Sequence, residues 1–289
     1  MITRRALLGS AVAAVAASST RRAFGAAAAP MPVAFVSHGG PMLAVDPVRG
    51  PALRAWGAKL SKPTGVLAIT PHWGSRHIAL GATGRGVAQY DFPRWLADKL
   101  PAGLAYASPP SEALARRVEA LLGDAYPVQR GGRTGMDHTT WTPLMHLLPS
   151  ADVPVLEMAY PYLQEPQLFA LGQKLAPLRD EGILLLASGG MTHNLASVDL
   201  DRADSPPPAW SREFDAWAAE RLAASDADAL IDWRHQAPAA DLAHPDDGGH
   251  FRVMLVGLGA ALARGGAAPA RFPYVGYELG LSVRCAELG

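Results

Sequence analysis

The chain has 289 residues and a formal net charge of zero, because 26 basic side chains balance 26 acidic ones. No basic run occurs after the first thirty residues, so the sequence indicates neither a nucleic-acid partner nor attachment to an anionic membrane surface. The single cysteine, Cys285, excludes an internal disulfide and a thiolate-rich zinc site. Any metal must therefore be bound by histidine or carboxylate side chains.

Residues 1–30 carry the pattern of an export signal. The pair Arg4 and Arg5 directly precedes a weakly apolar stretch from Leu7 to Ala17, and small residues follow. Paired arginines are typical of the twin-arginine route, and the apolar stretch is too short for a membrane span. We therefore expect cleavage near residue 30, a periplasmic mature protein without a membrane anchor, and one folded domain over 31–289.

Short apolar runs predict the strands of this domain, and amphipathic segments between them predict helices. The strands are expected at 32–37, 65–70, 77–80, 153–158, 183–188, 272–276 and 281–283, and the helices at 111–122, 141–148, 165–178, 209–222 and 249–263. In the fourth helix, Trp210, Phe214 and Trp217 recur at helical spacing and are expected to pack in the core. The alternation of strands and helices predicts a single-domain α/β sandwich, with a central mostly parallel or mixed sheet flanked by helices.

Three of the nine histidines follow predicted strands. His38 follows the strand at 32–37, His72 the strand at 65–70, and His193 the strand at 183–188. Ligands of open α/β sheets bind beyond the carboxyl ends of the strands, so we expect these side chains to meet at one edge. His250 begins the last predicted helix, and His138 lies in a loop before the helix at 141–148.

Neutral imidazole is a common ligand of Zn²⁺ and Fe²⁺. A redox metal needs open coordination positions, so three protein ligands are favoured over four, and a further histidine could move protons. The sequence motifs of zinc proteases, serine hydrolases and nucleotide-binding loops are absent. His244 competes with His250 for the third ligand position, because both flank Asp246 and Asp247. His146 is expected to be a hydrogen-bonded core residue.

Six segments in the same order resemble class III extradiol ring-cleavage dioxygenases of the protocatechuate 4,5-dioxygenase type, and most closely the 4,5-DOPA extradiol dioxygenase-like branch. These segments cover essentially all of the expected mature chain. They are FVSHGGPML (35–43), AITPHWG (68–74), GMDHTTW (135–141), LRDEGILLLASGGMTHNL (178–195), GGHFRVMLVGLGA (248–260) and YELGLSVRC (277–285).

The resemblance implies an α/β catalytic domain with one metal ion held by His38, His72 and His250. The histidine matching His193 is either an acid/base or an additional metal ligand, and the one matching His138 contacts the substrate or bound oxygen. The resemblance also implies Fe²⁺ for catalysis, with Zn²⁺ able to occupy the same site, and a catechol and O₂ as substrates. It does not identify the catechol or the oligomeric state.

Three alternatives remain open at this point, and one of them is a divergent member of the same superfamily that has lost its activity. A zinc hydrolase could use the same histidines, with His193 or Asp137 as its base, and would work without O₂. A periplasmic protein could instead bind a metal or an aromatic molecule without turnover, and would tolerate changes of His193 and His138.

Overall fold

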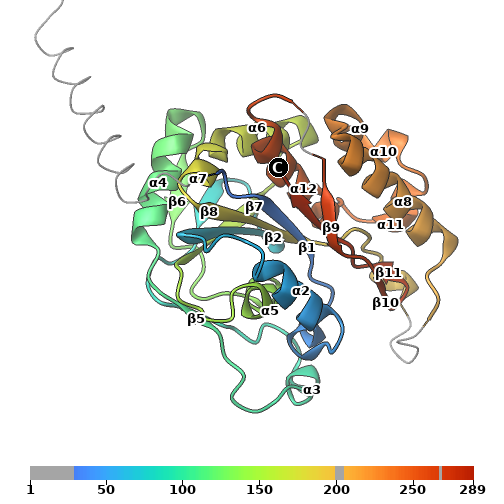
Figure 1. Cartoon of the computed structure of the whole chain (residues 1–289), viewed down its shortest axis with the longest axis horizontal. Coiled ribbons are helices and arrows are strands. Elements are labelled where there is room, and N and C mark those ends of the chain that lie inside the picture. The colour runs from blue at the N-terminus through green and yellow to red at the C-terminus, as the bar shows by residue number, and fades with distance from the viewer. Residues whose placement is uncertain (1–28, 199–204, 267–268) are drawn as a thin grey trace, which may run out of the picture.

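The computed structural model describes residues 29–198, 205–266 and 269–289. One mixed sheet runs through this part of the chain (Figure 1). Its eight strands have the order β6-β3-β7-β2-β8-β1-β12-β9. Its four central strands are parallel to one another; they are β7 (Val155–Pro161), β2 (Gly65–Ser75), β8 (Ile183–Gly189) and β1 (Val33–Ser37). The predicted single α/β domain with a mixed sheet is confirmed. The expected export signal falls almost entirely outside the described residues.

Antiparallel pairs extend the sheet on both sides of its parallel centre. On one side β12 (Cys285–Leu288) pairs with β1, and β9 (Arg271–Tyr274) pairs with β12. On the other side β3 (Ile78–Leu80) pairs antiparallel with β7, and β6 (Val128–Arg130) runs parallel to β3. Two small ribbons complete the described strands; they are β4 (Gly86–Val87) with β5 (Ala107–Ser108), and β10 (Tyr277–Glu278) with β11 (Leu281–Ser282).

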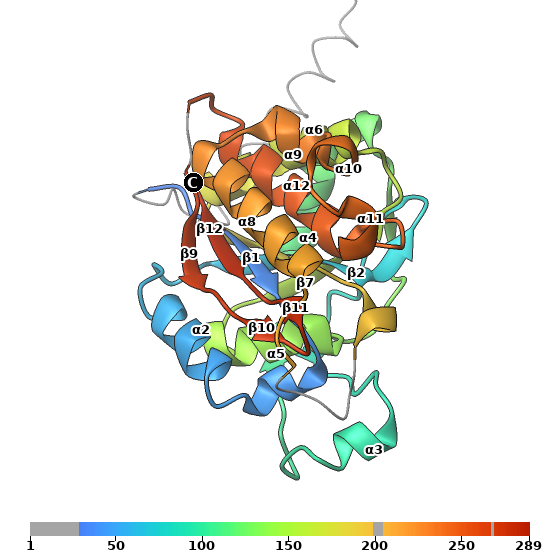
Figure 2. The same cartoon turned by 90° about the vertical axis from the view of Figure 1, so that its right-hand side faces the viewer.

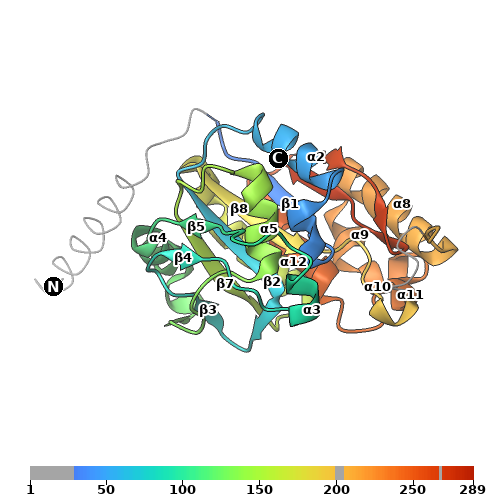
Figure 3. The ribbon, with the colours of Figure 1, turned by 90° about the horizontal axis from the view of Figure 1, so that it is seen from below.

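Helices cover both faces of the sheet (Figures 2 and 3). One face carries α4 (Glu112–Leu122), α6 (Glu165–Leu175), α8 (Ala209–Ala224) and α12 (Gly249–Leu262), and the other carries α2 (Arg49–Gly57) and α5 (His138–Leu147). The short helices are η1 (Pro41–Val45), α3 (Arg94–Ala97), η2 (Gly123–Ala125), α7 (Pro177–Asp180), η3 (Leu195–Ser197), α9 (Ala227–Ile231), α10 (Trp233–Gln236) and α11 (Ala240–Ala243). No helix of the described ranges is long and apolar enough to cross a membrane.

The sheet separates two hydrophobic cores, because successive side chains of a strand point to opposite faces. On β1, Val33 and Phe35 pack in the core beneath α12, whereas Ala34 and Val36 pack in the core beneath α2 and α5. Both sets are fully buried, which is why these strands read as continuous apolar runs. The aromatic stripe of α8 lies in the first core, with Phe214 buried, as expected.

The structure corrects several predicted boundaries. The helix expected over 165–178 ends at Leu175, because Pro177 lacks the N–H that would continue its hydrogen-bond ladder. The strand expected at 77–80 begins at Ile78, which leaves His77 outside it and exposed. Strand β12 has no counterpart among the predictions. Its four residues include Glu287, whose buried carboxylate accepts a hydrogen bond from Trp56 Nε1 at 2.6 Å.

Candidate metal centre

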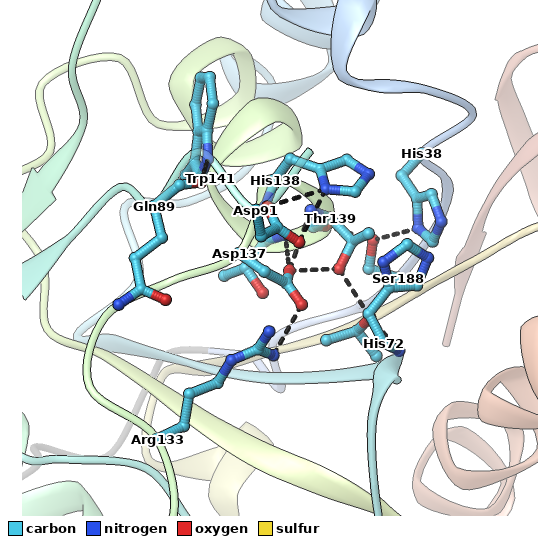
Figure 4. A network of polar contacts seen from close by, with 12 residues as sticks. His38, His72, Gln89, Asp91, Arg133, Asp137, His138, Thr139, Trp141 and Ser188 are labelled. Atoms are coloured by element: carbon cyan, nitrogen blue, oxygen red, sulfur yellow. Dashed lines mark hydrogen bonds and ion pairs between the residues drawn. The ribbon is translucent and has the colours of Figure 1, made fainter. Parts of the chain in front are cut away.

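Two of the predicted ligands come from β1 and β2, parallel strands of the sheet that β8 separates. His38 directly follows β1, and Gly39 after it has a φ of +62°, a left-handed conformation that glycine adopts without strain. His72 was expected beyond the end of β2, but it lies within this longer strand. Thr70 pairs with Ala159 and Gly74 with the next residue of β7, so three residues bulge out and direct His72 away from the sheet (Figure 4).

The third predicted ligand comes from the first turn of α12. His250 is the second residue of this helix, and its backbone oxygen accepts a hydrogen bond from the N–H of Gly190 at 2.9 Å. A Cβ on Gly189 would lie only 2.0 Å from that oxygen. Gly189 at the end of β8 and Gly190 just after it therefore let the start of α12 approach the edge of the sheet closely.

The three imidazoles face one another at this edge. Their ring centroids lie 5.1 Å (His38–His72), 5.3 Å (His38–His250) and 5.3 Å (His72–His250) apart. The Nε2 atoms of His72 and His250 are 3.3 Å apart, and one nitrogen from each of the three rings lies within 4.8 Å of the others. Two nitrogens that bind one ion at about 2.0–2.1 Å, at a near-tetrahedral angle, are separated by roughly the 3.3 Å found between His72 and His250. The donor set therefore fits a metal ion.

The surroundings keep these imidazoles in the neutral form that binds metals. Burial lowers the pKa of His38 and of His250 well below the ordinary value, and the neighbouring histidines lower both further. Burial also lowers the pKa of His72 to about 4, although part of this residue is exposed to solvent. All three rings are consequently neutral at pH 7, when their nitrogen lone pairs can bind an ion.

His193 lies beside these three residues but is not oriented like them. Its ring stacks on that of His250 with centroids 3.5 Å apart and planes 10° apart, and its Nδ1 lies 3.5 Å from Asp246 Oδ2. The lone pair of an imidazole nitrogen lies in the ring plane, so an ion bound in the plane of His250 would lie outside the parallel plane of His193. The set His193, Asp246 and His250 does bring three possible ligand atoms together. Parallel rings nevertheless cannot both direct a lone pair at one ion, so this stacking favours a proton-transfer role for His193.

His138 completes the cluster, with a partner that the sequence did not indicate. Its ring centroid is 5.0 Å from that of His72. Its Nδ1 lies 3.0 and 3.1 Å from the two carboxylate oxygens of Asp91, and its backbone N–H donates to Asp91 Oδ1 at 2.9 Å (Figure 4). An ionised carboxylate only accepts hydrogen bonds, so Nδ1 carries the proton and Nε2 is left for other contacts. Phe92 lies edge-on to the same ring, with centroids 5.5 Å apart.

Asp137 caps α5 instead of facing the cluster. Its carboxylate is fully buried and accepts from the backbone N–H groups of Thr139 and Thr140, from the Thr139 hydroxyl and from Arg133 Nη1. Three of these donors bind Oδ1, and Arg133 binds Oδ2. Asp137 is therefore not placed to act as the base that the hydrolase hypothesis assigned to it.

The remaining histidines with assigned expectations lie away from the centre. His244, the rival of His250, is buried among Phe214, Trp233 and Phe251, and its Nε2 contacts the backbone oxygen of Met191 at 3.1 Å. His146 is the expected core residue, with Nε2 hydrogen-bonded to the Leu43 oxygen at 2.9 Å. 

An α/β sheet with three neutral histidines at its edge, flanked by two histidine–aspartate pairs, is the kind of site that a metal-dependent enzyme uses. Comparisons with known proteins identify which kind. The family model described as the catalytic LigB subunit of aromatic ring-opening dioxygenase matches residues 33–274. The chain belongs to this family, and is an extradiol ring-cleaving dioxygenase.

The similarity to known proteins extends over most of the chain. A protein of Beta vulgaris named 4,5-DOPA dioxygenase extradiol is 34% identical over 237 residues, covering 78% of this chain and 85% of its own. A protein of the same name from Escherichia coli K12 is 30% identical over 271 residues, covering 90% and 95% of the two chains. The crystal structure of an uncharacterized protein of Escherichia coli K12 superposes with a TM-score of 0.74 at 29% identity, covering 90% of this chain and all of that one.

Proposed function

We propose that this protein opens the ring of a DOPA-like catechol with O₂ at a single ferrous ion held by His38, His72 and His250. The observation that carries the proposal is the convergence of three imidazoles from the end of β1, the bulge of β2 and the start of α12. The names of the relatives support a DOPA-like substrate. A ferrous ion held by these residues would bind the catechol and supply electrons to O₂, which d¹⁰ Zn²⁺ cannot do, although three imidazoles also suit Zn²⁺.

The two histidine–aspartate pairs would manage the protons. In His193 the carboxylate of Asp246 faces Nδ1, so Nε2 is the nitrogen available to take a proton from a catechol hydroxyl and to return it later. The hydrogen bond from His193 and the surrounding donors lower the pKa of the Asp246 carboxyl, which keeps it an ionised acceptor at neutral pH. On the other flank, Asp91 accepts from Nδ1 of His138, and a ring that also carries a proton on Nε2 would donate it toward negative charge that develops during the reaction.

The test is oxygen uptake by metal-free protein reloaded without air with Fe²⁺ or with Zn²⁺. The substrates are DOPA, caffeate and protocatechuate, and a yellow ring-opened semialdehyde is the expected product. Uptake that requires Fe²⁺ supports the proposal, and the ranking of the three catechols reports the substrate class. Uptake should fall sharply in His193→Gln and remain in His235→Gln, a change of an exposed histidine that pairs with Asp232. Stoichiometric iron at the site without uptake on any catechol would overturn it and favour a hydrolase or a binding protein.

We also propose export of the protein to the periplasm, on the strength of Arg4, Arg5 and the short apolar stretch after them. Fusing residues 1–30 to a reporter that is active only after twin-arginine export tests this. Replacing both arginines by lysine should abolish export. Unchanged export of the lysine variant would refute the twin-arginine assignment.

A further inference from the structure

A proline inside α5 leaves one backbone oxygen beside the metal centre without its helical partner. In an α-helix the carbonyl of residue i accepts from the N–H of residue i+4. The helix runs from His138 to Leu147, and residue 143 is proline, which has no N–H. The oxygen of Thr139 therefore needs another donor, because this part of α5 is fully buried.

Ser188 supplies that donor from the end of β8. Its side chain is fully buried, and its hydroxyl donates to the Thr139 oxygen at 2.5 Å. The same Oγ lies 3.1 Å from Nδ1 of His38 (Figure 4). A serine hydroxyl has one proton and two lone pairs, and a carbonyl oxygen can only accept. The proton of Ser188 is thus committed to Thr139, so Oγ must be the acceptor in its contact with His38.

We infer that Pro143 and Ser188 together fix His38 as the tautomer with its proton on Nδ1. In this tautomer Nε2 carries the lone pair on the side of His72 and His250, so the ring is ready to bind a metal before any ion arrives. Ser188 is a positioning residue, and Pro143 acts through it by removing the competing donor. The inference rests on the proposed function only in that His38 is taken as a metal ligand.

The geometry also explains why a proline is accommodated here. Without Pro143, the N–H of residue 143 would bind the Thr139 oxygen and release the Ser188 proton. Ser188 could then donate to Nδ1 of His38, which would move the ring proton to Nε2, the nitrogen needed for the metal. Hydrogen bonds that orient the ligands of a metal typically change its affinity about 10- to 100-fold.

The first experiment reads the tautomer directly in metal-free protein. Long-range ¹H–¹⁵N spectra of protein labelled at histidine ring nitrogens distinguish a protonated nitrogen from an unprotonated one, and the spectrum of His38→Asn assigns the signal. We expect His38 to carry its proton on Nδ1 in the wild type and to show the other tautomer in Ser188→Ala. A wild-type proton on Nε2 would overturn the inference, whatever the enzyme does with catechols.

The second experiment measures Zn²⁺ affinity by competition with a chelator. Ser188→Ala should bind about 10- to 100-fold more weakly. The matched control is Ser108→Ala, which removes a buried hydroxyl on β5 that has no hydrogen-bond partner within the described chain. Equal affinity of Ser188→Ala and wild type would contradict the inference.

Pro143→Ala separates positioning from stability and covers the case in which Ser188→Ala fails to fold. It restores a helical hydrogen bond, so its denaturation midpoint should not fall below that of the wild type, yet His38 should show a mixture of tautomers and bind Zn²⁺ more weakly. A stable variant with wild-type tautomer and affinity would exclude the role of Pro143. Protein that shows the expected tautomer and binds Fe²⁺ but consumes no O₂ would refute the proposed function alone.

Discussion

Asp91 offers the sharpest test of the flank opposite His193. Its carboxylate accepts the backbone N–H of His138 at 2.9 Å and faces Nδ1 at 3.0 and 3.1 Å. A hydrogen bond to a charged acceptor contributes about 1.5–3 kcal/mol. If Asp91→Ala releases the ring from its catalytic orientation, a loss of this size in the transition state corresponds to a fall in kcat of about 10- to 100-fold. The fall should appear in kcat more than in KM, because His138 is expected to act on charge that develops during the reaction.

Asp91→Asn separates orientation from charge, and the assay is steady-state oxygen uptake with the iron-loaded enzyme. The amide oxygen can still accept from the backbone and from Nδ1, so this variant should lose less activity than Asp91→Ala. Asp98→Ala is the control, since Asp98 is an exposed residue just after α3 with only a 3.9 Å contact to Arg94. Equal kcat in Asp91→Ala and the wild type would show that His138 does not depend on Asp91. Equal losses in both Asp91 variants would assign the effect to charge alone.

Two further predictions concern stability. Burial raises the pKa of Glu157 to about 8, and the negative charge of Asp137 contributes to this rise. The folded chain therefore holds a proton on Glu157 that the unfolded chain loses above about pH 4.5. The stability of the fold should fall as the pH rises between these two values. Glu157→Gln should therefore match the wild type near pH 5 and exceed it by up to a few kcal/mol at pH 8.5 in urea titrations, and a gap independent of pH would contradict this. Metal at 1,000 times its Kd adds about 4 kcal/mol to the folded state, so Zn²⁺ should raise the melting temperature by roughly 10 °C. The rise should vanish in His72→Ala and persist in His235→Ala, and an undiminished rise in His72→Ala would place the ion elsewhere.

The sheet and the histidines at its edge could be predicted from the sequence because both follow local rules. Apolar runs such as 183–188 are buried on both sides and therefore contain almost no polar side chain. The carboxyl ends of parallel strands share one edge, so residues just after separate strands, such as His38 and His193, could be expected together without knowing the strand order. His72 was placed correctly near this edge although the bulge that carries it, within β2, was not foreseen.

The partners of those histidines could not be predicted, because they depend on how distant segments align. Asp91 lies 47 positions before His138 in an irregular segment, and Ser188 lies 150 positions after His38. The Ser188 hydroxyl can reach the His38 ring only because β1 and β8 pair in parallel with Val36 opposite Ser188. A shift of this register by one residue would turn the Ser188 side chain to the other face of the sheet.

The start of α5 shows how a local rule can fail at a functional site. The helix is expected at 141–148, whereas the threonines before Trp141 have low helix propensity, as does the internal proline. It begins three residues earlier because the buried Asp137 carboxylate caps it, and it continues through Pro143 because Ser188 satisfies the oxygen that the proline leaves free. The departure from propensity and the hydrogen bond to the metal ligand therefore have one cause. A sequence with alanine at 143 would predict this helix better, and on our account would hold the metal less well.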